Sequence, residues 1–273
     1  MIDLQPFLEE GFLRYALLGL IMLAPMCAAM GVQVVNLRMA FFSDAVSHSA
    51  FAGVALGLLA AIDVQVAMGA LALLIGLLIT AVARRGKLST DTVIGVFFSA
   101  VVAFGLTVVY RHRHLAGQVQ MLIYGNILTI GPRELFCQAA LLVVLTAFQI
   151  VGFNRLLYIA LNPTLASAHR VPTRAYQYLF AGLLSLVVVF SVQAVGVFLV
   201  TAMLIVPAAT ARNLARSAAG MFWWAQLVAL SSALAGLVIS AQPWGDTPPG
   251  ATIILVASAW FLLSGVVAAL RPR

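Results

Sequence analysis

Charged side chains are scarce in this sequence: they make up 8% of the 273 residues, whereas hydrophobic residues make up 63%. Soluble domains carry about 25% charged residues, so water alone could not solvate a folded surface built from this chain. The mean hydropathy of +1.09 indicates lipid as the surrounding medium. The net charge of +7 does not indicate a nucleic-acid partner, because the basic residues lie between long apolar stretches.

Motifs that would indicate an enzyme are also missing from the sequence. There is no GxxxxGK[ST] phosphate-binding loop, so the chain cannot hydrolyse ATP by itself, and there is no HExxH motif for a catalytic zinc. Cys27 and Cys137 form no CxxC pair. We interpret both as buried small hydrophobic residues, with zinc or disulfide chemistry as the alternative. We therefore expect neither an enzyme nor a permanently bound cofactor.

Long apolar runs rich in Leu, Ala, Val and Gly make up most of the sequence. A bilayer core about 30 Å thick requires about 20 apolar residues per helix, whereas barrel strands need alternating segments of about 10 residues. The sequence therefore predicts an all-α, polytopic transmembrane helical bundle, with residues 1–273 as a single domain. Eight or ten spans are alternatives to nine, because the sixth and seventh almost touch at Gln193–Gly196. The nine expected spans are 12–31, 44–61, 64–83, 92–110, 134–151, 176–193, 195–211, 221–240 and 251–270.

The placement of Lys and Arg predicts the orientation, since basic residues accumulate in cytoplasmic loops. We expect the N-terminus outside and the C-terminus in the cytoplasm. Four basic residues then lie outside: Arg14, Arg111, Arg113 and Arg133. The other 11 of the 15 lie inside: Arg38, Arg84, Arg85, Lys87, Arg155, Arg170, Arg174, Arg212, Arg216, Arg271 and Arg273.

Apart from Glu134 at the boundary of the fifth span, Asp44 is the only acidic residue within a predicted span, and His48 is the only histidine. Their four-residue spacing places both on one helical face. If the chain is helical from Arg38 at the inner boundary, the two residues lie about 9 and 15 Å inward, near the midplane. An acid at that depth costs at least about 2.5 kcal/mol, so such groups are usually functional. A carboxylate and an imidazole suit a divalent cation of the zinc or manganese type. Two copies of the chain would supply four ligands.

Other interpretations of these residues stay open. The pair could be hydrogen-bonded and merely fix helix packing, or Ser43–Asp44 could cap a helix that begins there. The same helix carries a stripe of small residues that would let another helix backbone approach closely: Ala45, Ser49, Gly53 and Gly57. His112 and His114, beyond the fourth span, could capture a metal on entry, although a solvated basic patch is the simpler interpretation.

The polar segment 154–175 is too hydrophilic to cross the membrane. Within it, Asn162 is a good helix N-cap and Pro163 suits the first helical position, while Pro172 ends the helix. The sequence therefore predicts a short helix on the cytoplasmic face. Its role is either to dock a partner or simply to connect two spans.

Taken together, the chain resembles the permease subunit of the ATP-binding cassette (ABC) importers for zinc, manganese and iron(II). The segments that carry the resemblance follow one order over nearly the whole chain: Arg38, Asp44–His48, Gly53–Gly57, Tyr124–Leu128, Gly196–Val200, Ile205–Arg212, and Ser240 with Asp246–Gly250. Glycine is usual in the family where this chain has Arg170, and an acid where it has Asn162. The left-handed helix end that glycine permits is therefore in question here.

The resemblance implies a permease of a bacterial cytoplasmic (inner) membrane that works by alternating access. Asp44 and His48 match positions that line the metal pathway. The loop-helix residues that match the ATPase-docking segment are Leu165, Ala166, Ala168, His169 and Arg170. The implied partners are a second copy of the chain, two ATP-binding cassette ATPase subunits, an external metal-binding protein and membrane lipid.

Zinc is the expected cargo, because imidazole favours zinc over manganese; manganese or iron(II) are alternatives. A permease for a metal–chelate complex, a proton-driven transporter and, more distantly, an intramembrane metalloenzyme are the competing hypotheses. The metalloenzyme would need a third ligand and a general base within the membrane.

Overall fold

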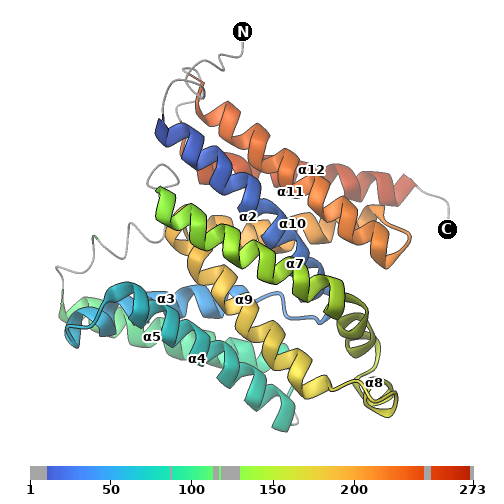
Figure 1. The fold of residues 1–273 in the computed structure, drawn as a ribbon, viewed down its shortest axis with the longest axis horizontal. Coiled ribbons are helices and arrows are strands. Elements are labelled where there is room, and N and C mark those ends of the chain that lie inside the picture. The colour runs from blue at the N-terminus through green and yellow to red at the C-terminus, as the bar shows by residue number, and fades with distance from the viewer. Residues whose placement is uncertain (1–10, 87, 113–116, 118–129, 243–246, 271–273) are drawn as a thin grey trace.

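The computed structural model describes residues 11–86, 88–112, 117, 130–242 and 247–270. Within these residues the chain is helical, without strands (Figure 1). Nine long helices and one short helix, α8, make up this part of the chain: α2 (Gly11–Asn36), α3 (Phe42–Leu59), α4 (Val64–Arg85), α5 (Thr90–Arg111), α7 (Pro132–Leu161), α8 (Pro163–Ala168), α9 (Thr173–Val195), α10 (Val197–Leu214), α11 (Ala218–Ser240) and α12 (Pro249–Leu270).

The predicted transmembrane bundle is confirmed. Eight of the described helices are long and apolar enough to cross a bilayer. The other long helix, α3, packs against α4, α5, α9 and α10 inside the bundle. Each of the nine predicted spans falls on one of the long helices, with bounds that differ by a few residues, except that α7 continues to Leu161.

Side-chain caps explain where several helices begin. Asp63 accepts hydrogen bonds from the backbone N–H groups of Gln65 and Val66, at 2.9 and 3.1 Å, and so caps α4. Ser89 accepts from the N–H of Thr92 at 3.1 Å and caps α5. Both caps satisfy N–H groups that have no partner within the helix.

Small residues set the distance between packed helices. A Cβ atom placed on Gly53 would lie 2.6 Å from the Met68 Cα on α4, and one placed on Gly57 would lie 3.2 Å from the Val64 Cα. On α11, a Cβ on Gly236 would meet the backbone of Ile253 in α12 at 2.5 Å. The small-residue stripe of α3 therefore lets two helix backbones touch, as such stripes do in lipid.

Gly196 alone separates α9 from α10. Its φ of 83° and ψ of 164° lie in a region that is essentially restricted to glycine. The chain can therefore leave α9 and enter α10 without a loop, which explains why the two predicted spans almost touch. Both helices are long enough to cross a bilayer.

Successive long helices alternate in direction, so the start of α2 and the end of α12 lie at opposite ends of the bundle (Figure 1). The end of α4 and the starts of α5 and α9 meet α8 around one cavity, so these segments share one end of the bundle. The assignment of that end to the cytoplasm stays a prediction from the placement of the basic residues.

Candidate functional site

Asp44 and His48 form an open stripe on an otherwise buried stretch of α3. Over residues 42–50 these two side chains alone keep partial solvent exposure, and the other seven residues are buried. The four-residue spacing places both on one face, as predicted. The polar pair is therefore directed toward accessible space, whereas its neighbours are packed inside the chain.

Thr201 of α10 holds the carboxylate in place. Its Oγ1 donates a hydrogen bond to Asp44 Oδ1 at 2.7 Å. Asp44 also lies in the first turn of α3, where the positive end of the helix dipole favours a negative charge. The carboxylate is therefore oriented by one side chain and stabilised by its own helix.

The assumed helical path from Arg38 to Asp44 is wrong. Residues 37–41 form turns, Arg38 has a φ of 56°, and α3 begins only at Phe42. Ser43–Asp44 does not cap α3 either, because Phe41 occupies the N-cap position without a side-chain cap bond. Figure 1 shows the connection from the end of α2 running back into the bundle before α3 starts.

Contact with α10 fixes the level of Asp44 along the bundle. At 1.5 Å per residue, Thr201 lies about 6 Å from the α9-proximal start of α10 and about 20 Å from its other end. The hydrogen bond ties Asp44 to this level, about one turn from the start of α10. The depth of Asp44 in the membrane stays a prediction, and the recessed start of α3 at Phe42 replaces the helical path on which that prediction was based.

His48 packs against α5, where its ring meets Phe98 edge to face with centroids 5.0 Å apart. Within the described residues, no group of three or more His, Cys, Asp or Glu side chains could hold a metal ion. One chain therefore offers two metal-ligand side chains at this point, together with the Thr201 hydroxyl. Sequence reasoning missed Thr201 and Phe98, although Thr201 directly follows the Gly196–Val200 segment.

The short helix predicted after Asn162 is present as α8 (Pro163–Ala168). Asn162 Oδ1 accepts from the N–H groups of Thr164 and Leu165, at 2.9 and 3.1 Å. Arg170 adopts a φ of 59°, so the left-handed turn forms without glycine. The expected docking residues divide between two sides. Ala166 is buried in the chain's own core, whereas the others are exposed: Leu165, Ala168, His169 and Arg170.

The other sequence candidates lie apart from the Asp44–His48 pair. His112 is the C-cap of α5, with its N–H donated to the Val108 carbonyl at 3.0 Å, and His114 lies outside the described residues. Cys27 is buried in α2, as expected, whereas Cys137 is only partly buried, and both are free thiols.

Comparison with known proteins identifies the family. Residues 9–268 match the ABC 3 transport family. The chain belongs to this family. It is 29% identical over 249 residues to the high-affinity zinc uptake system membrane protein ZnuB of Haemophilus influenzae, covering 91% of this chain and 95% of ZnuB. It is 30% identical over 257 residues to the manganese transport system membrane protein MntC of Halalkalibacterium halodurans, covering 94% and 87%.

The fold of this ABC 3 chain also matches a solved structure. PsaBC from Streptococcus pneumoniae in complex with Fab superposes with a TM-score of 0.81 at 28% identity, covering 95% of this chain and 93% of the matched one. The family and the fold confirm the resemblance noted in the sequence. The chain is a multi-pass transport subunit and not an enzyme.

Proposed function

We propose that this chain is the permease of an ATP-driven importer of divalent metal, with zinc as its cargo, and that the cation passes between Asp44 and His48. The observation that carries the proposal is the open stripe on α3, where these two ligands alone are accessible among buried neighbours. Their place inside a transmembrane bundle supports it, since intramembrane ionisable groups usually mark an ion pathway.

Two copies of the chain complete the coordination. One chain supplies one carboxylate and one imidazole, whereas zinc prefers four ligands. A two-fold axis beside the open stripe would bring two such pairs together. Such a site would form when the stripes face each other and open when they separate. The cation would therefore be held briefly, as alternating access requires.

The choice of zinc is argued from ligand chemistry. Two imidazoles and two carboxylates suit zinc better than manganese, which favours oxygen ligands. The relatives do not decide the question, since ZnuB is named for zinc and MntC for manganese at nearly the same identity. Manganese and iron(II) are therefore the alternatives that transport measurements must separate.

Energy must come from separate ATPase subunits, since the chain has no phosphate-binding loop. The exposed side of α8 is the surface we assign to them, with Leu165 60% exposed at its centre. Ala166 packs α8 against the bundle instead. A movement of the ATPase subunits that displaces α8 would therefore also displace the helices in the core. An external metal-binding protein would deliver the cation. We place this chain in a bacterial inner membrane with its own N-terminus on the outside.

Uptake into proteoliposomes that contain the chain and its ATPase tests the proposal, with zinc, manganese and iron(II) compared in parallel. A ligand that contributes more than about 1.4 kcal/mol changes an equilibrium constant at least tenfold. Asp44→Asn and His48→Ala should therefore each lower ATP-dependent uptake by at least about tenfold, while dimerisation is preserved.

Asp63→Asn is the matched control. Asp63 is exposed and caps α4, and asparagine caps helices as well as aspartate does, so this variant should transport normally. Normal zinc uptake by both site variants would refute the pathway. Uptake in liposomes that lack the ATPase would instead identify a proton-driven transporter.

A further inference from the structure

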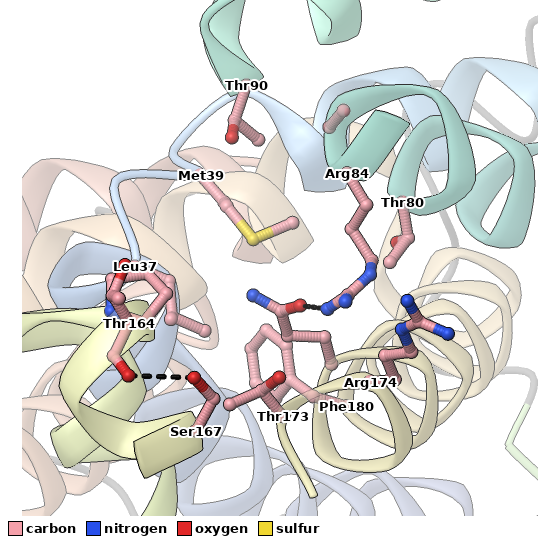
Figure 2. A pocket seen from close by; sticks show the side chains of 13 residues that line it. Leu37, Met39, Thr80, Arg84, Thr90, Thr164, Ser167, Thr173, Arg174 and Phe180 are labelled. Atoms are coloured by element: carbon pink, nitrogen blue, oxygen red, sulfur yellow. Dashed lines mark hydrogen bonds between the residues drawn. The ribbon is translucent and has the colours of Figure 1, made fainter. Parts of the chain in front are cut away.

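A cavity of about 560 Å³ lies on the bundle side of α8, at the end of the molecule where α4 stops and α5 and α9 begin (Figure 2). The connection between α2 and α3 contributes Leu37 and Met39 to its wall. The volume falls in the range of small-molecule sites, about 300–1,000 Å³. It far exceeds the space of a single bound water, about 30 Å³.

The described lining of the cavity carries positive charge. Among the described residues that line it, Arg84 and Arg174 are present and Asp and Glu are absent. Arg84 donates one hydrogen bond to the amide oxygen of Gln177, and the other N–H groups of its guanidinium stay available. Within the described part of the chain, neither arginine forms an ion pair with an acidic side chain. Two cations beside one cavity indicate an anionic ligand.

Hydroxyl groups and helix ends add to this preference. Thr164 and Ser167 of α8 lie across the cavity from the two arginines (Figure 2). Thr90 and Thr173, also in the wall, are the first residues of α5 and α9. The start of a long helix has a positive dipole end that favours phosphate, although the Thr92 N–H of α5 is already bonded to Ser89 and the Thr173 N–H of α9 to Val171. Hydroxyl donors and two helix starts therefore surround the same space as the guanidinium groups.

Part of the wall is apolar, with Leu37, Met39 and Phe180 among its residues. A small inorganic anion would leave this apolar surface uncovered, whereas a phosphate ester supplies both a negative charge and carbon atoms that can contact the apolar wall. We propose that the cavity binds a phosphate group, carried either by an anionic phospholipid of the inner leaflet or by a soluble phosphate compound. Basic pockets on the cytoplasmic side of transmembrane helices are known to take such headgroups.

A ligand at this position would tie α8 to the rest of the bundle. Thr164 and Ser167 belong to α8, Arg84 to α4 and Arg174 to α9, so one phosphate could bridge three helices. The surface of α8 around Leu165 stays exposed, whereas Ala166 is buried. Binding in the cavity therefore leaves that surface free and stabilises the helix from behind.

The test uses the purified full-length chain in a neutral detergent and does not require transport. The melting temperature is measured with added phosphatidylglycerol, phosphatidylcholine or inorganic phosphate, and bound lipid is counted by native mass spectrometry. Phosphatidylglycerol should raise the melting temperature more than phosphatidylcholine does. Arg84→Gln and Arg174→Gln should each weaken binding by about tenfold, equivalent to about 1.4 kcal/mol. The effect should diminish at high salt.

Arg85→Gln is the matched control, because Arg85 is exposed at the end of the same helix and does not line the cavity. It should bind lipid like the wild type, as should Arg84→Lys, which keeps the charge. Equal stabilisation by inorganic phosphate would assign the site to a soluble phosphate. Equal responses to both lipids without any response to phosphate, or a double Arg84→Gln, Arg174→Gln variant that binds normally, would overturn the proposal.

Discussion

The contact between α3 and α4 makes Gly53→Ala an informative substitution. Gly53 is buried, and a Cβ added there would lie 2.6 Å from the Met68 Cα and 3.0 Å from the Ala67 carbonyl oxygen. Carbon atoms pack best at about 3.5–4.0 Å. Because the obstructing atoms belong to a helix backbone, no side-chain rotation relieves the clash, and α3 must move away from α4 by about 1 Å.

The expected cost combines two opposing contributions. Overpacking of this kind destabilises by about 1–3 kcal/mol, whereas alanine is about 0.8–1.0 kcal/mol better than glycine inside a helix. For a chain of this size, 1 kcal/mol shifts the melting temperature by about 2–4 °C. We therefore expect Gly53→Ala to lower the melting temperature by up to about 10 °C. Uptake should fall as well, since α3 carries Asp44 and His48.

Gly69→Ala separates packing from helix propensity. Gly69 lies in α4, and a Cβ there would meet nothing within 4 Å, so this variant should melt at or above the wild-type temperature. Both variants are measured by thermal unfolding in the same detergent, with uptake assayed in parallel. A Gly53→Ala protein that melts within 1 °C of the Gly69→Ala protein would refute the claimed backbone contact.

Two further substitutions test details of the site and of the docking helix. Thr201→Val keeps the side-chain shape but removes the hydroxyl that donates to Asp44 Oδ1; since a hydrogen bond to a charged group contributes about 1.5–3 kcal/mol, metal uptake should fall by about tenfold or more, and Thr201→Ser should restore it. Wild-type uptake by Thr201→Val would show that Asp44 needs no such support. Arg170→Gly removes a non-glycine residue from a φ of 59°, so thermal stability should rise by about 1 kcal/mol. A lower melting temperature would indicate that the arginine side chain makes a stabilising contact.

The transmembrane architecture could be predicted because lipid imposes a simple pattern. A bilayer requires long apolar helices, and the polar stretches between them mark the connections. Caps such as Ser89 and Asn162 were also predictable, because they act on N–H groups two or three residues away. The Asp44–His48 pair stood out for a similar reason: apart from Glu134 at the boundary of the fifth predicted span, each is the only residue of its kind within a span.

Features that depend on distant segments could not be predicted. Nothing near Thr201 in the sequence shows that its hydroxyl meets a carboxylate 157 residues earlier. The recessed start of α3 was missed because residues 37–41 carry no proline or glycine that would mark a break. Arg38 adopts a positive φ there instead, a conformation that asparagine or glycine would have signalled. Ala166 was assigned to a docking surface because it matches the family's docking segment, and only the packing of α8 shows that it is buried.

The recessed start of α3 bears on how tightly a cation could be held. Because α3 begins at Phe42, Asp44 lies in the first turn, where the helix dipole compensates part of its charge. Thr201 satisfies one of its oxygens. A carboxylate that is already stabilised by its own protein gains less from a metal than an isolated one would. His48, one turn further along, lies beyond the range of this dipole effect. The pair therefore suits a transient site, in which the cation binds without being trapped.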